Sequence, residues 1–143
     1  MHYLTVQDII WIHLQITNKQ GKFSFDKLEE AASYQYAYGK SHDVVSQAAR
    51  FFRGFSILNP FESGNSAVGF VSGIVFLELN GLSFNPKDMD LAQWHMRAID
   101  LSTSKTAIES GTEAAKEGHQ MSAREVTKSV LERYEIAIPK LLK

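Results

Sequence analysis

A run of apolar residues from Ala67 to Leu79 constrains the fold more than any other part of the chain. Its main interruptions are Ser72, Gly73 and Glu78, so a helix made from it would have no polar side. A helix that is apolar all round belongs in the centre of a domain. Val and Ile are frequent and leave a buried strand as the alternative, but the run exceeds the usual strand length. The sequence therefore favours a central buried helix, which the left-handed stop Asn80-Gly81 ends.

Size and composition indicate one globular domain, residues 1–143. The chain is 44% hydrophobic and 11% aromatic, which is enough for a single core and argues against wholesale disorder. The formal charge is −1 and no run of like charges is present, so no nucleic-acid partner is expected. There is no cysteine for disulfides or metal binding. No signal segment or membrane-spanning run is expected, so the sequence indicates a soluble cytoplasmic protein without a membrane partner.

Two strong helices are predicted before the central one. Thr5 with Asp8 forms an approximate capping box ahead of a helix over residues 6–17. Asp43 can cap the second helix, which has a wide apolar stripe and reaches the loop at residues 57–60. Both helices are therefore expected to pack into the core.

The segments between these helices carry weaker signals. Phe23-Ser24-Phe25 is expected to be extended and residues 26–36 to form a short helix. Residues 81–87 are expected to form a loop. Asp88 or Asp90 then opens a helix, and the apolar residues assigned to it are Leu91, Trp94, Ile99 and Leu101.

The C-terminal part is predicted to be helical as well. Residues 102–120 are polar but helix-prone. Ser122 with Glu125 forms a capping box, and the helix that follows is expected to pack on the chain's own core. Pro139 is expected to end regular structure. The whole chain is thus predicted to be all-α.

The loop before the central helix carries the candidate site. It reads Asn59-Pro60-Phe61-Glu62-Ser63-Gly64-Asn65-Ser66-Ala67. This segment resembles the signature of the Fic/Doc (Fido) family of nucleotide-dependent transferases, His-Pro-Phe-x-Asp/Glu-Gly-Asn-Gly/Lys-Arg. The residues that fit the frame are Pro60, Phe61, Gly64 and Asn65. The positions of the histidine, the acid, the glycine or lysine, and the arginine hold Asn59, Ser63, Ser66 and Ala67.

The resemblance extends beyond the motif and is to the Doc-like, death-on-curing branch. It is strongest over residues 3–84, looser over 85–101, and leaves 102–143 as a helical C-terminal extension. It implies a Fic/Doc-like helical domain in which the central buried helix follows the motif loop. It also implies a short extended flap within residues 22–39. The aromatic residues of that segment are either ordinary packing, the favoured interpretation, or a peptide-binding surface; they are Phe23, Phe25, Tyr34, Tyr36 and Tyr38.

The substitutions in the motif remove the groups that the family's chemistry needs. Family members transfer AMP or phosphate from a nucleotide to a protein hydroxyl. A histidine takes the proton of that hydroxyl, and Asn59 cannot accept it. An acid holds Mg²⁺, for which the neutral hydroxyl of Ser63 is a poor replacement. Ala67 offers neither donor nor charge to phosphate. We therefore expect no intact catalytic group, no metal site and no cofactor.

Some features of a phosphate-binding loop persist. The amides of Gly64, Asn65 and Ser66 can still face an anion at a helix N-terminus. Gly64 is explained equally well by a turn with positive φ, and Asn65 is favoured as a helix cap. Pro60 and Phe61 are expected to be structural, Phe61 as the anchor of the loop in the core.

Three other side chains are candidates to replace the lost groups. His42 could lie near the site as a base, and a shifted loop could direct Glu62 at a metal. A solvated loop carboxylate is the favoured interpretation for Glu62. His13 lies on the apolar face of the first helix, so a buried, hydrogen-bonded histidine is expected there.

The sequence favours a degenerate Fic/Doc-fold protein without transferase activity that acts as a protein-binding or regulatory module. The resemblance suggests a small antitoxin-like chain as the partner, as in bacterial toxin–antitoxin pairs. The alternative is a nucleotide- or phosphate-binding transferase with altered chemistry at the same loop, which would use a nucleotide with Mg²⁺. The sequence leaves the oligomeric state open.

Overall fold

The computed structural model describes residues 1–37, 39, 42–115 and 121–142. Within these residues the chain forms seven α-helices, one antiparallel pair of short strands and a C-terminal 3₁₀ helix. The elements in chain order are α1 (Val6–Thr17), α2 (Phe25–Ser33), α3 (Val44–Leu58), α4 (Asn65–Leu79), β1 (Leu82–Phe84), α5 (Leu91–Ala98), α6 (Ser104–Gly111), β2 (Thr112–Ala114), α7 (Ala123–Arg133) and η1 (Ile138–Leu141). This content agrees with the mainly helical fold that the sequence predicts.

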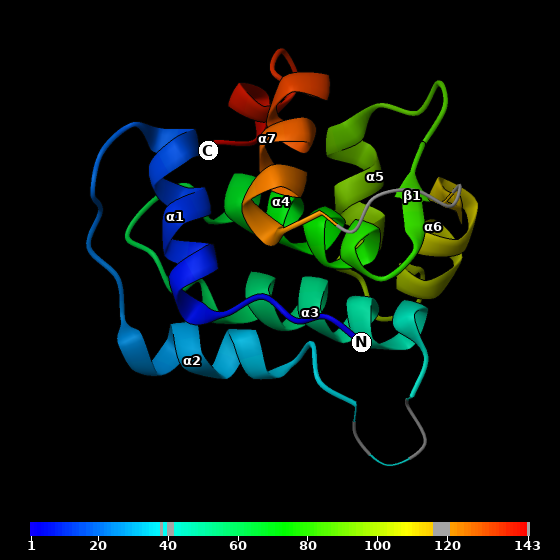
Figure 1. Cartoon of the computed structure of the whole chain (residues 1–143), viewed down its shortest axis with the longest axis horizontal. Helices are drawn as coiled ribbons and strands as arrows, with labels where there is room; N and C mark the ends of the chain where they lie inside the picture. Colours follow the sequence, from blue (N-terminus) through cyan, green and yellow to red (C-terminus); the bar gives the residue numbers. More distant parts are fainter. Residues whose placement is uncertain (38, 40–41, 116–120, 143) are drawn as a thin grey trace.

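Helix α4 is the centre of the domain (Figure 1), with α1, α3 and α7 packed around it. Every residue from Ala67 to Leu77 is buried. The predicted central helix is thus confirmed, and it begins two residues earlier than the apolar run, at Asn65. Gly81 has a φ of 90°, so the left-handed stop after the helix is also confirmed.

Helices α3 and α4 approach each other closely because glycine lies at their contact. A Cβ atom at Gly73 would overlap the ring of Phe52, and one at Gly69 would lie 3.0 Å from Cδ1 of Phe55. Close-packed interiors leave no room for such an overlap, so the ring of Phe52 occupies the space that a side chain at position 73 would need. The two glycines let the aromatic rows of α3 rest on the backbone of α4.

The predicted helix starts are confirmed by their caps. The capping box of Thr5 and Asp8 opens α1, and that of Ser122 and Glu125 opens α7. The carboxylate of Asp43 accepts a hydrogen bond from the Ser46 amide at the start of α3. Asp90 does the same for α5 through the Gln93 amide. These local bonds satisfy backbone donors that have no partner inside the helix, which is why they can be read from sequence.

Two segments differ from prediction because they pair with each other. Residues 82–84, expected as a loop, form β1, and residues 112–114, expected within a helix, form β2. Phe84 is opposite Thr112 in this antiparallel pair and lies 4.6 Å from Trp94, measured between ring centroids. The strands are distant in sequence and only three residues each, so local periodicity carries no signal for them. Residues 116–120 of the predicted helix lie outside the described residues.

Four smaller predictions are corrected. Phe25 is the first residue of α2 rather than part of an extended segment, because Ser24 caps that helix. Helix α2 also ends earlier than expected, at Ser33 and not at residue 36. Leu101 follows the end of α5 and is 72% exposed, not on the helix face with Trp94. Pro139 lies in the first turn of η1, where the missing N–H is no loss.

The substitution Gly73→Ala tests the close contact between α3 and α4. Replacing glycine by alanine inside a helix ordinarily stabilises it by about 1 kcal/mol. Here we expect a loss of about 1–3 kcal/mol in the free energy of unfolding, because the new methyl group overlaps the Phe52 ring. Urea denaturation measures the change. Adding Phe52→Leu should recover part of the loss, and a Gly73→Ala protein as stable as the parent would contradict the packing.

Candidate functional site

The motif loop, residues 59–67, spans the connection from α3 to α4 and the first three residues of α4. The connection turns at both ends through left-handed backbone. Asn59 ends α3 with a φ of 46°, and Gly64 precedes α4 with a φ of 81°. At Gly64 a Cβ would also lie 3.3 Å from the methyl group of Thr17. The turn itself therefore accounts for the glycine.

Phe61 anchors the loop in the core, as predicted. Its side chain is 4% exposed and its ring stacks on His13 with 4.1 Å between centroids. The loop backbone also pairs with residues 22–24, through Phe23 opposite Phe61. The Ser24 amide donates to the Pro60 carbonyl at 2.8 Å. Residue 23 is thus extended as expected, while half of the predicted flap segment is helix α2.

Asn65 does not cap the central helix, contrary to the favoured interpretation. The cap position is Gly64, and no side chain bonds to the free amides there. Asn65 is the next residue, and its side chain turns back to the loop. Its Oδ1 accepts from the Phe61 amide at 2.9 Å, and its Nδ2 donates to the Phe61 carbonyl at 2.7 Å. Both polar atoms of this side chain are therefore committed to closing the loop.

The positions at which this chain departs from the Fic/Doc signature bear no charge. Asn59 and Ser63 are exposed, whereas Ala67 is fully buried against the core. Ser66 is exposed at the first turn of α4. Glu62 is an exposed loop residue whose amide donates to the Lys22 carbonyl. Within the described part of the chain, no three side chains of the metal-binding types gather into a site.

The two histidine candidates from the sequence do not supply a base. His13 is 3% exposed and its Nε2 lies 3.0 Å from the Ser63 carbonyl oxygen, so it is buried and hydrogen-bonded as predicted, and its partner lies in the motif loop. His42 does not lie near the loop: it precedes α3, whereas the loop follows that helix. The 15 residues of α3 separate the two ends by about 22 Å.

A small cavity of about 120 Å³ opens beside the loop, between α3, α4 and α5. Pockets that bind cofactors or drug-sized ligands usually measure about 300–1,000 Å³. The cavity has room for a few water molecules but not for a nucleotide. The residues that line it are Phe52, Phe55, Ser56, Asn59, Asn65, Ser66, Gly69, His95 and Ile99.

His95 is the one titratable side chain among these lining residues, and no pattern in the sequence selects it. It is 5% exposed and packs edge-on to Phe70 with 5.7 Å between ring centroids. Its Nδ1 has no hydrogen-bond partner among the described residues. Burial lowers the pKa of His95 from 6.5 to about 4, so the ring is neutral at physiological pH.

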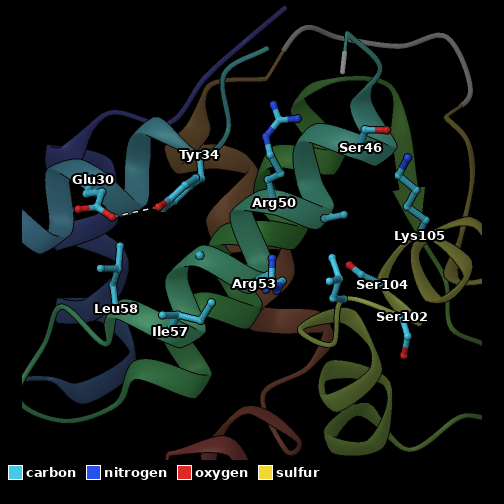
Figure 2. A pocket seen from close by; sticks show the side chains of 13 residues that line it. Glu30, Tyr34, Ser46, Arg50, Arg53, Ile57, Leu58, Ser102, Ser104 and Lys105 are labelled. Carbon is cyan, nitrogen blue, oxygen red and sulfur yellow. Dashed lines mark hydrogen bonds between the residues drawn. The ribbon is translucent and has the colours of Figure 1, made fainter. Parts of the chain in front are cut away.

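A larger groove of about 400 Å³ lies on the face of α3 that points away from α4. Figure 2 shows α3 along its floor, with Glu30 and Tyr34 on one side and Ser102, Ser104 and Lys105 on the other. Sequence reasoning did not identify this groove. Its floor and its two walls come from three separate segments that only the fold brings together.

No protein-family model, curated protein or solved structure matches this chain. No described helix combines the length and the hydrophobicity needed to cross a membrane.

The lowered pKa of His95 predicts acid sensitivity. Between pH 6.5 and pH 4 the unfolded state binds a proton at this residue that the native state does not, so stability falls as pH falls through that window. The loss attributable to His95 is on the order of 3 kcal/mol. Urea denaturation at pH 7 and pH 4.5 should show a smaller difference for His95→Gln than for the parent.

A matched variant separates this effect from other acid-sensitive groups. The pKa values of the Asp43, Asp100 and Glu125 carboxyls are also lowered, because a serine amide and hydroxyl bond to each. Those groups remain in the control His42→Gln, which replaces an exposed ring and should keep the parent's pH dependence. An unchanged pH dependence in His95→Gln would contradict the prediction.

The substitution Asn65→Ala tests the closed loop. It removes both side-chain bonds to the Phe61 backbone, so we expect a loss of about 1–3 kcal/mol in the free energy of unfolding. The neighbouring exposed position serves as the control, where Ser66→Ala should change stability by less than about 0.5 kcal/mol. Chemical denaturation of both variants at pH 7 provides the comparison. Equal effects would show that Asn65 does not stabilise the loop.

Proposed function

We propose that this chain is a degenerate Fic/Doc-fold protein that lacks AMP- and phosphate-transferase activity and acts as a protein-binding or regulatory module. The observation that carries the proposal is the motif loop, in which Asn65 and the neighbouring His13 are bonded to the loop backbone and the exposed positions Asn59, Ser63 and Ser66 carry no charge. Asn65 bonds to Phe61 through both ends of its amide, and His13 contacts the Ser63 carbonyl.

Three further features argue against transfer chemistry at the loop. The position of the phosphate-binding arginine is Ala67, which is fully buried, so no cation can act from that side chain. The adjacent cavity is too small for a nucleotide. His95 is buried among aromatic rings, and protonation is unfavourable there, so it is poorly suited to accept a proton from an attacking hydroxyl.

Exposed apolar side chains support a binding role. Large hydrophobic residues that lie open to solvent mark interaction surfaces when they gather around a depression. Ile57 is 65% exposed and Leu101 is 72% exposed, and both line the groove over α3. We propose a protein partner in the cytoplasm, of the small antitoxin-like kind that the family resemblance suggests, and neither a nucleic acid nor a membrane.

A transfer assay tests the proposal. The purified chain is incubated with Mg²⁺, a protein extract and ATP labelled at either the α- or the γ-phosphate, beside an active Fic enzyme as a positive control. We expect no labelled protein above background, because base, metal ligand and phosphate-binding cation are all absent from the loop. Label that depends on the chain would refute the proposal.

A nucleotide titration separates the alternative function. If the loop still binds phosphate, calorimetry with ATP and Mg²⁺ will give saturable binding, and Ser66→Glu will abolish it by adding a negative charge at the cavity. We expect no heat of binding for the parent up to about 1 mM ATP. A Kd of about 1 mM corresponds to a binding free energy of about −4 kcal/mol, so any binding would be weaker than that. Saturable binding lost in Ser66→Glu would favour an altered transferase instead.

A further inference from the structure

The floor of the groove over α3 is one continuous face of a helix. Seven residues of α3 line it at helical spacing, from Ser46 in the first turn to Leu58 in the last. That stretch is about 18 Å long, or a little more than three helical turns. The opposite face of α3 is buried against the core, and on the groove face Ser46 and Gly54 are buried while Arg53 and Ile57 are exposed to a ligand.

The first wall of the groove is Tyr34, at the end of α2. Gly54 lets its ring lie directly on α3, because a Cβ at that position would overlap the ring carbon Cδ2. The Tyr34 hydroxyl donates to the Glu30 carboxylate at 3.0 Å (Figure 2). The ring is therefore held in place, and Glu30, the one carboxylate among the described lining residues, is already bonded.

The second wall is the segment from Leu101 to Lys105, which leads into α6. The side chain of Leu101 is 72% exposed, and Ile57 on the floor is 65% exposed. An enclosed small-molecule pocket would bury such side chains, whereas an open one of this kind leaves them for a partner to cover. The length of the floor, about 18 Å, suits a helix of about three turns laid along it.

The charge around the groove is positive. Arg53 and Lys105 are exposed lining residues, and neither forms an ion pair with a residue that the structure describes. Helix α6 starts beside them without a side-chain cap, so the positive end of its dipole faces the same region. Asp43 and Asp100 do not line the groove, but Lys105 acts electrostatically on Asp43 and Arg53 on Asp100, so the two acids partly balance these cations. Among the lining residues themselves, the cations Arg50, Arg53 and Lys105 outnumber the single acid Glu30. A negatively charged occupant fits this surface.

We infer that the groove over α3 binds an acidic amphipathic helix of a partner protein. Its apolar face would cover Ile57 and Leu101, and its carboxylates would lie against Arg53 and Lys105. This inference rests on the proposed role in protein binding. It specifies the face of this chain that binds, which is the groove over α3, and the chemistry of the partner, which is acidic and amphipathic. The groove contains no residue of the motif loop, so peptide binding in the groove does not depend on whether the loop still binds phosphate.

Designed peptides test the inference on the full chain. The probe is a fluorescein-labelled helical peptide of about four turns, with leucine at positions i, i+4, i+7 and i+11 and glutamate on its flanks. Fluorescence polarisation should give saturable binding, with a Kd on the order of 10 µM. A peptide with lysine in place of glutamate, and one with the same composition but scrambled leucines, should bind at least about tenfold more weakly.

Matched variants locate the binding face. The double substitution Arg53→Glu, Lys105→Glu and the single substitution Leu101→Ser should each weaken the acidic peptide by about tenfold or more. Two controls outside the groove should leave its Kd unchanged. Lys128→Glu reverses an exposed charge on α7, and Met96→Ser removes an apolar side chain that is 68% exposed on α5.

Each negative result has a separate meaning. No binding of the acidic peptide up to about 1 mM, equal binding of all three peptides, or undiminished binding to the groove variants would overturn this inference. Those outcomes would leave the proposed loss of transferase activity standing. Labelled protein in the transfer assay would instead refute the proposed function, whatever the peptides do. Circular dichroism of each variant shows whether a loss of binding reflects unfolding.

Discussion

The contact between α3 and α4 is the interaction on which the rest of the structure depends. Glycines at positions 69 and 73 let the rings of Phe55 and Phe52 rest on the central helix. This contact fixes the two ends that the motif loop must join. It also buries one face of α3 and leaves the opposite face as the floor of the groove. A single helix pair therefore defines both the loop and the surface that we propose for partner binding.

The residues of the motif loop that fit the Fic/Doc signature have structural roles in this chain. Phe61 is buried in the core, Gly64 makes a turn with positive φ, and Asn65 closes the loop. These structural roles stabilise the native fold whether or not a phosphate binds. Under the proposed relationship, Asn59, Ser63 and Ala67 stand where the family has its base, acid and arginine, and none of the three makes the turn.

Much of the helical framework could be predicted because its signals are local. The capping boxes at Thr5 and Ser122, and the unbroken apolar character of α4, depend on residues a few positions apart. The burial of His13 followed from its place on the apolar face of the first helix, and the anchoring role of Phe61 followed from the family resemblance. The strand pair could not be predicted, since its partners are about 30 residues apart and too short for a periodic signal. The predicted side-chain direction of Asn65 was wrong because a cap and an adjacent first-turn residue have the same sequence signature.

By itself, the sequence determined the central helix, the capped starts of α1, α3 and α7, and the absence of histidine and arginine from the motif loop. These follow from residue type, spacing and hydrogen bonds within one turn. Only the tertiary structure decided which distant side chains share a space. It brought His95 to the cavity beside the loop and withdrew that ring from water, and it set Tyr34 and Lys105 on opposite sides of α3. Burial and proximity of this kind arise from packing between elements, and no local pattern encodes them.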